Sequence, residues 1–258
     1  MIPKESDKSN SPEKPELIKW FSEIGKNSGN VAGGKGANLG EMYNLKVPVP
    51  PGFVVTAQAY DYFIENSGLK DKIKNLLDKI NYEDTQLLND ITEEIRKLIV
   101  ESKFPKEMEE EIIEAYESLG AEDLSSVKGE ALDILNNAQE PIFVAVRSSA
   151  TTEDLAEASF AGQQDSFLNI KGDSELLDHV RKCFASLFTP RATYYRNKQG
   201  FKDVQASLAV VVQKMVDSTK SGVIFSKDPS YKKDNIIMEA VWGLGEGIVS
   251  GAITPDKY

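Results

Sequence analysis

The sequence of 258 residues contains only one cysteine, Cys183, and only one histidine, His179. A single cysteine excludes an internal disulfide, and one thiol with one imidazole cannot supply the ligands of a Cys/His zinc site. The two residues lie four positions apart in a segment with helical periodicity, which favours packing within a helix over a Ser-His-Asp or Cys-His catalytic arrangement. This cysteine usage predicts a reducing, cytoplasmic setting.

Long hydrophobic runs are also missing. The two longest, Ile142 to Val146 and Leu208 to Val212, contain five residues each, whereas a membrane-spanning helix needs about 20. Residues 1–16 are rich in Lys, Ser, Pro and Glu, which predicts a disordered leader and no signal peptide. The net charge of −11 argues against non-specific binding to nucleic acid or to an anionic membrane. We therefore expect a soluble protein with neither partner.

The rest of the chain is predicted to form two lobes. Residues 17–206 are expected to form an N-terminal lobe with a helical insertion at 69–120, where apolar residues recur at intervals of three and four. Residues 207–258 are expected to begin a second lobe. From Pro141 onward, short apolar runs alternate with turns and helical segments. This pattern predicts an α+β fold with a mixed or antiparallel sheet.

Capping residues and apolar patterns predict the individual elements. Thr56 and Ser174 are candidate N-caps, because a hydroxyl oxygen can accept a hydrogen bond from a free N–H of the first helical turn. The predicted helices cover residues 37–44, 56–68, 174–188 and 190–200. The predicted strands or hairpins cover residues 53–55, 142–146, 159–170, 208–216, 222–226 and 236–241.

Lys35 lies in a turn made of Gly33, Gly34 and Gly36, ahead of a predicted helix. Glycines let the backbone approach a ligand closely, and the N-terminus of a helix presents free N–H groups to an anion. The segment is not a Walker A loop, which requires Ser or Thr directly after the lysine. Taken alone, the turn is equally typical of a solvated surface lysine.

Arg147 directly follows the predicted strand 142–146 and precedes several hydroxyl side chains. A guanidinium at the end of a rigid strand suits bidentate binding of a phosphate. The alternative is an ion pair between Arg147 and the nearby Glu153 or Asp154. Together, Lys35 and Arg147 suggest the two halves of a polyphosphate clamp and are the candidate catalytic residues.

The segment 159–166 combines a glycine with amides, hydroxyls and a carboxylate. This composition suits a lid over phosphate groups, although it is equally typical of an ordinary turn. The candidate ligand-binding residues in this segment are Gly162, Gln163, Asp165 and Ser166.

Two further candidates lie near the C-terminus. Gln213, Lys214, Met215 and Val216 end an apolar strand, where the backbone can bond a purine edge while Met215 packs on its face. A methionine in a strand is nevertheless more often part of the core. Glu239 is a carboxylate within an apolar strand, so it needs a partner such as a ribose hydroxyl or a lysine.

Five segments, taken in order, resemble the N-terminal ATP-binding domain of the phosphoenolpyruvate synthase and pyruvate phosphate dikinase family, to which rifampicin phosphotransferase is related. The resemblance extends from about Ile18 to Tyr258, and the motifs are specific as a set but not singly. The five segments are residues 33–42 (GGKGANLGEM), 49–56 (VPPGFVVT), 146–154 (VRSSATTED), 159–165 (SFAGQQD) and 187–196 (LFTPRATYYR).

This resemblance implies an ATP-grasp-type fold, with ATP lying between two lobes. It also implies that the β-phosphate passes to a histidine on a separate domain, and then to pyruvate on a third. At the matching positions, Lys35 and Arg147 would hold the ATP phosphates and residues 162–166 would cover them. Residues 213–216 would form the adenine hinge, and Glu239 would face the adenosine.

In that family, an acidic Asp-x-Glu stretch and a Gln-Ala-Arg-Pro stretch complete the Mg²⁺ and phosphate site, and both normally lie beyond the position of Tyr258. The predicted cofactors are therefore ATP and Mg²⁺, with no metal ligand among these residues. We expect a C-terminally incomplete fold, either a fragment or a split-gene product, which cannot complete the reaction alone. It would need the phosphohistidine and pyruvate-binding domains in cis or in trans. Two alternatives stay open: a non-catalytic nucleotide-binding module, and the ATP half of a phosphotransferase with rifampicin or glucan as acceptor.

Overall fold

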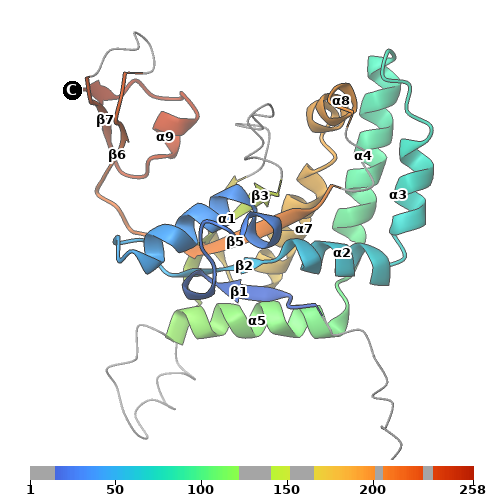
Figure 1. Cartoon of the computed structure of the whole chain (residues 1–258), viewed down its shortest axis with the longest axis horizontal. Helices are drawn as coiled ribbons and strands as arrows, with labels where there is room; N and C mark the ends of the chain where they lie inside the picture. Colours follow the sequence, from blue (N-terminus) through green and yellow to red (C-terminus); the bar gives the residue numbers. More distant parts are fainter. Residues whose placement is uncertain (1–14, 122–140, 152–165, 201–205, 229–234) are drawn as a thin grey trace, which may run out of the picture. The chain divides into compact units, whose positions relative to one another are not determined.

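The computed structural model forms two units, residues 1–215 and residues 216–258. Figure 1 labels the helices and strands of both. The residues that the structure describes are 15–121, 141–151, 166–200, 206–228 and 235–258.

The first unit is built on a five-stranded antiparallel sheet with the strand order β1-β2-β5-β3-β4 (Figure 1). The central strand β5 has a continuous apolar run, Leu208 to Val212, in which every residue is buried. Such a run is expected where both faces of a strand are covered. The strands are β1 (Ile18–Trp20), β2 (Gly52–Val55), β5 (Leu208–Lys214), β3 (Phe143–Ala150) and β4 (Ser166–Lys171).

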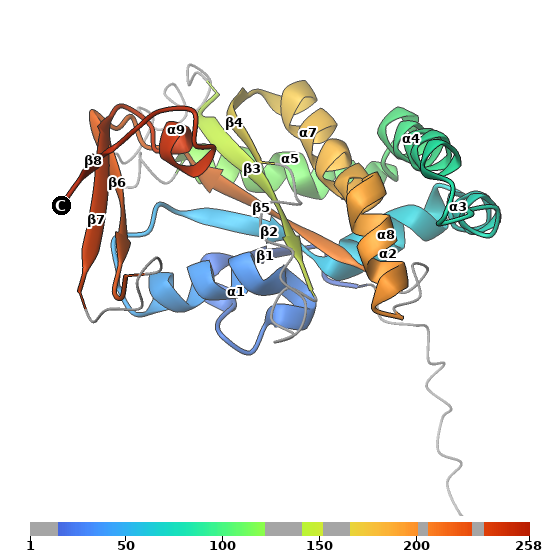
Figure 2. The ribbon, with the colours of Figure 1, turned by 90° about the horizontal axis from the view of Figure 1, so that it is seen from above.

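Helices cover both faces of this sheet. Helix α1 lies on one face, and α2, α5 and α7 lie on the other (Figure 2). Each face has its own apolar cluster: Ala32 of α1 packs with Val54 and Val211, whereas Val146 and Val210 belong to the larger opposite cluster. The helices of this unit are α1 (Gly29–Asn44), α2 (Ala57–Asn66), α3 (Lys70–Leu77), α4 (Thr85–Glu101), α5 (Lys106–Ala121), α7 (Asp173–Ser186) and α8 (Pro190–Lys198), with a short 3-10 helix η1 (Phe21–Glu23).

The predicted helical insertion at 69–120 corresponds to α3, α4 and α5. Its periodic apolar side chains are buried, among them Ile95, Ile99 and Ile112. They belong to the same cluster as Val146 of the sheet. These helices are therefore part of the core of the first unit, because their amphipathic faces need an apolar surface to cover.

Helix ends follow the capping predictions in part. Thr56 caps α2 as predicted, since its hydroxyl accepts a hydrogen bond from the Ala59 N–H at 3.0 Å. Ser174 is not a cap, because α7 already begins at Asp173, after Gly172 with its positive φ of 88°. The predicted helix at 37–44 is longer than expected and begins at Gly29.

The second unit contains a three-stranded antiparallel sheet with the order β6-β7-β8. The sequence predicts its start at residue 207, but β5 (Leu208–Lys214) pairs with β2 and β3 in the first sheet. Its elements are β6 (Lys220–Phe225), β7 (Ile237–Trp242), α9 (Glu246–Val249) and β8 (Asp256–Lys257).

The mixture of helices and antiparallel strands confirms the predicted α+β class. Within the described ranges, no helix is both long and apolar enough to cross a membrane. The predicted leader lies outside the described residues as far as position 14, whereas the backbone carbonyl of Glu16 accepts a hydrogen bond from the Thr56 hydroxyl at 2.8 Å.

Thr56 gives a direct test of this packing. Its buried hydroxyl bonds both the first turn of α2 and the Glu16 carbonyl, so we expect Thr56→Ala to lower the free energy of unfolding by about 1–2 kcal/mol. Urea unfolding followed by circular dichroism measures the change. Thr85→Ala, at the exposed start of α4, is the control. Equal stability of the Thr56→Ala variant and the wild type would contradict the capping role.

Candidate functional site

Four of the predicted site residues lie on the face of the sheet that α1 covers. Arg147 in β3 pairs with Val211 in β5 and with Ser166 in β4, and paired residues in an antiparallel sheet project to the same face. Val211 packs against α1, so Arg147 and Ser166 share that face. Gln213, two positions further along β5, also lies on it, and α1 itself carries Lys35 (Figure 2).

Lys35 lies just after a break in α1. Gly33 has φ 65° and ψ 173°, which separates a first helical turn from the remainder of the helix. Lys35 therefore lies in the first turn of the longer segment, at a helix entrance as predicted. Its ammonium donates a hydrogen bond to the Ser148 carbonyl of β3 at 3.0 Å.

Ser149 joins this helix entrance to the sheet. Its hydroxyl donates to the Ala32 carbonyl at 2.9 Å and accepts from the Gly36 N–H at 3.2 Å. The contact is so close that a Cβ atom on Gly33 would lie 2.3 Å from both the carbonyl oxygen and the hydroxyl oxygen of Ser149. Position 33 therefore has to be glycine, for space and for its backbone conformation.

Arg147 lies within a strand rather than after one, which corrects the prediction. β3 continues to Ala150 because its ladder with β5 extends through the small residues Ser148 and Ser149. The Nε of Arg147 is buried and has no hydrogen-bond partner among the described residues. Burial lowers the pKa of its guanidinium. The alternative partners Glu153 and Asp154 lie outside the described residues.

This geometry brings the two predicted cations to one place. The Lys35 ammonium bonds the carbonyl of Ser148, the residue that follows Arg147 in β3. The N-terminal end of a helix adds a partial positive charge beside them. A buried N–H group without a partner, such as the Arg147 Nε–H, gains most from an acceptor that carries negative charge. The arrangement is thus suited to binding an anion.

The predicted lid residues are only partly described. Gly162, Gln163 and Asp165 lie outside the described residues. Ser166 begins β4 and pairs with Arg147.

The predicted hinge begins at the end of β5. The Gln213 amide donates to the Pro50 carbonyl at 3.1 Å. The backbone N–H groups of Lys214 and Met215 donate to Pro51 and Phe143, so both are occupied within the first unit. Any bond from this strand end to a purine would therefore have to use other groups. Val216 is exposed and belongs to the second unit.

Glu239 lies in β7 of the second unit. The sequence suggests a buried carboxylate that needs a lysine or a hydroxyl partner, and a lysine is present: Lys257 of β8 lies 3.7 Å from the carboxylate. Glu239 is partly exposed rather than buried, and it is paired with Lys257 in the register of β7 and β8. Its predicted role toward adenosine stays a prediction.

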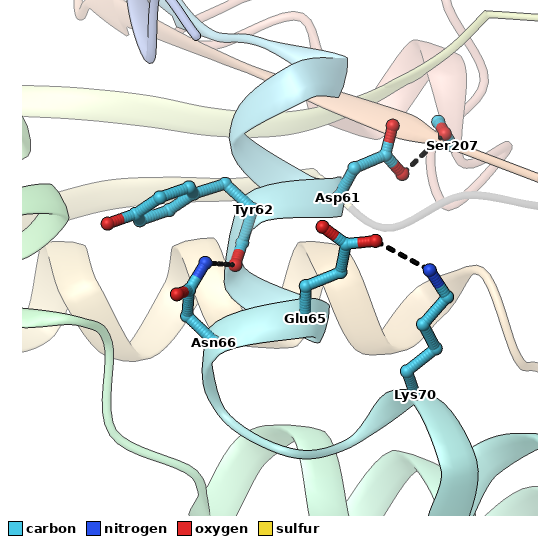
Figure 3. A network of polar contacts seen from close by, with 6 residues as sticks. All are labelled: Asp61, Tyr62, Glu65, Asn66, Lys70 and Ser207. Carbon is cyan, nitrogen blue, oxygen red and sulfur yellow. Dashed lines mark hydrogen bonds and ion pairs between the residues drawn. The ribbon is translucent and has the colours of Figure 1, made fainter. Parts of the chain in front are cut away.

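A separate polar cluster lies on α2 and α3 (Figure 3). Asp61 accepts a hydrogen bond from the Ser207 hydroxyl at 2.8 Å, and Glu65 pairs with Lys70 at 2.5 Å. Desolvation raises the pKa of the Asp61 carboxyl, and the Ser207 hydrogen bond opposes this shift. These side chains line a pocket of about 360 Å³, which contains none of the predicted site residues.

Sequence reasoning missed the part played by Ser149. It was noted only as one of several hydroxyls near Arg147, and its partner Gly36 lies 113 positions away. No periodic or local pattern links positions that far apart. In the described part of the chain, no group of three His, Cys, Asp or Glu side chains is arranged to hold a metal ion.

Comparison with known proteins gives a consistent result. Residues 29–258 match the family described as "Pyruvate phosphate dikinase, AMP/ATP-binding domain". The chain is 49% identical to the probable phosphoenolpyruvate synthase of Methanocaldococcus jannaschii, over 94% of this chain and 19% of that protein. It is 45% identical to the phosphoenolpyruvate synthase of Pyrococcus furiosus, over 94% of this chain and 32% of that protein. The chain thus spans about a third or less of the length of these relatives.

The close approach at Gly33 gives a stability test. In Gly33→Ala, the new methyl group would meet Ser149 and the backbone would keep a conformation nearly exclusive to glycine, so we expect the free energy of unfolding to fall by about 3 kcal/mol or more. Gly68→Ala is the control for a positive φ, since Gly68 also has a φ of 65° but no atom within 4 Å of a new Cβ. Equal losses in urea unfolding would show that backbone strain alone, not the contact with Ser149, requires Gly33.

Proposed function

The chain belongs to the family of pyruvate phosphate dikinase AMP/ATP-binding domains, and from this membership we propose that it binds ATP, with Lys35 and Arg147 on the polyphosphate. The observation that carries the proposal is the arrangement of these two cations on one face of the sheet, joined through the hydrogen bond between Lys35 and β3.

Arg147 supports the proposal through its unmet hydrogen bond. A buried guanidinium N–H without an acceptor costs free energy, and Arg147 Nε is in that state among the described residues. A phosphate oxygen would accept this bond and supply the opposite charge. The lowered pKa has the same cause, desolvation of the charged group, which an anion would offset.

Lys35 supports it through its place in the helix. It belongs to the first turn after the break at Gly33, where the helix dipole favours an anion. A lysine there holds a phosphate as a point charge, whereas Arg147 can form two directed bonds. The two side chains together would neutralise and orient a polyphosphate, which is the main contribution of a protein to phosphoryl transfer.

The other assignments are finer parts of the same proposal and rest on the family resemblance. Residues 162–166 would cover the phosphates, residues 213–216 would contact adenine, and Glu239 would face the adenosine. The two units would act as the lobes of an ATP-grasp-like fold in a cytoplasmic enzyme. A bound Mg²⁺ would neutralise charge on the phosphates. The described residues contain no group of three His, Cys, Asp or Glu side chains arranged for a metal ion, so no step is assigned to it.

The complete reaction belongs to a longer protein or an assembly. Relatives named phosphoenolpyruvate synthase are about three or more times as long as this chain. We propose that the phosphoryl group passes from ATP to a histidine on a separate domain, and from there to pyruvate. The acceptor domain also decides whether the chain serves a rifampicin or glucan phosphotransferase instead.

A second candidate is a nucleotide-binding module without catalysis. The observation in its favour is that residues 29–258 match an AMP/ATP-binding domain. Phosphate transfer that appears when the histidine-bearing domain of a relative is added would exclude this candidate.

Calorimetric titration with ATP and Mg²⁺ tests the proposal. Arg147→Ala removes charged hydrogen bonds worth about 1.5–3 kcal/mol, so we expect the affinity for ATP to fall by roughly 10- to 150-fold. Lys35→Ala should weaken binding in the same direction, because it removes the second cation.

Arg181→Ala is the matched control for this titration. Arg181 also has a buried Nε without a described partner, but it lies on α7, which covers the opposite face of the sheet from α1. Its loss should leave ATP affinity unchanged. Full affinity for ATP in Arg147→Ala would contradict the proposed site.

A further inference from the structure

The break in α1 leaves a helix entrance without a cap of its own. Gly33 precedes the longer helical segment and so occupies its N-cap position. An N-cap side chain normally accepts a hydrogen bond from the N–H of the second or third residue of the helix. Glycine has no side chain, so it cannot provide this bond. The third residue after Gly33 is Gly36, whose N–H needs another acceptor.

Ser149 supplies the missing acceptor from the sheet. Its hydroxyl accepts from the Gly36 N–H at 3.2 Å, the bond that a capping side chain would make. The same hydroxyl donates to the carbonyl of Ala32, the residue before the break, at 2.9 Å. Ser149 is fully buried, so water does not compete for these bonds. One side chain of β3 thus holds both sides of the break.

Ser149 also lies close to both residues that are predicted to contact phosphate, Lys35 of α1 and Arg147 of β3. Ser149 and Arg147 are two positions apart in β3 and therefore share a face of the sheet. Lys35 directly precedes Gly36, which Ser149 holds. Two hydrogen bonds thus join α1 to β3 beside the two cations: the Gly36 N–H bonds the Ser149 hydroxyl, and the Lys35 ammonium bonds the Ser148 carbonyl.

We propose that Ser149 is a positioning residue, which caps α1 from β3 and thereby sets the placement of Lys35 relative to Arg147 for the polyphosphate of ATP. This inference rests on the proposed function. Ser149 touches no phosphate in this scheme, since both functions of its hydroxyl are occupied by α1. It acts through the position of Lys35.

Removal of the Ser149 hydroxyl should change the position of Lys35 relative to Arg147 while leaving both positive charges in the protein. In Ser149→Ala, the Gly36 N–H and the Ala32 carbonyl lose their partner, and the entrance of α1 is free to shift on the sheet. If Lys35 no longer reaches the phosphates, one charged hydrogen bond to ATP is lost. We therefore expect ATP affinity to fall roughly 10-fold or more in Ser149→Ala.

A double-mutant cycle separates this role from a loss of stability. ATP titrations of the full chain compare wild type, Ser149→Ala, Lys35→Ala and the double variant. If Ser149 acts through Lys35, its removal should weaken binding by roughly 10-fold in the wild type but by less than about twofold in the Lys35→Ala background. A general structural defect would weaken binding equally in both.

Two more variants complete the design. Ser186→Ala removes another buried hydroxyl, which bonds the Cys183 carbonyl within α7, and it should leave ATP affinity unchanged. Ser149→Cys keeps a donor and an acceptor at this position in a slightly larger and weaker hydrogen-bonding group, so it provides a second variant if Ser149→Ala does not fold. It should show the same dependence on Lys35 with a smaller loss.

Three outcomes would overturn the inference. Equal losses of affinity in the two backgrounds would show that Ser149 does not act through Lys35. Unchanged affinity in Ser149→Ala would show that the cap is not needed for binding. If Lys35→Ala and Arg147→Ala both leave affinity unchanged, the proposed function itself fails, and the positioning role fails with it.

Discussion

The arrangement of the candidate site depends on one hydroxyl group, that of Ser149. It bonds α1 on both sides of the break at Gly33, and it comes from the same face of β3 as Arg147. This contact leaves no space for a side chain at Gly33, and Lys35 beside it bonds the Ser148 carbonyl of β3. β3 is paired on both sides, with β5 and with β4. Its position is therefore fixed by the sheet, and so is the position of the residues that it carries.

Burial explains why this face suits an anion. The sheet is covered by helices on both sides, so Arg147 loses water without gaining a described partner for its Nε. A partly buried cation whose Nε–H lacks an acceptor is stabilised by a bound anion. The net charge of −11 gives the chain no general attraction for phosphate, so capture depends on these local groups.

The sequence predicted the local elements better than the long-range contacts. Thr56 as a cap and the periodic helices at 69–120 depend on neighbouring residues, and both are confirmed. The apolar pattern predicts that the strand ends before Arg147, whereas β3 continues through two serines because it pairs with β5 there. No local pattern in the sequence reveals this pairing. The Ser149 contact with Gly36 joins positions 113 residues apart. Only the paired motifs suggested that Lys35 and Arg147 would lie on elements that contact each other, as α1 and β3 do.

The most direct test of the central claim follows the Nε–H resonance of Arg147 by NMR while ATP is added. The account predicts a downfield shift that saturates with ATP, because a phosphate oxygen becomes the missing acceptor of this N–H group. The Nε–H of Arg181, which is also buried without a described partner, serves as an internal reference and should not move. An unchanged Arg147 resonance at saturating ATP would contradict the account.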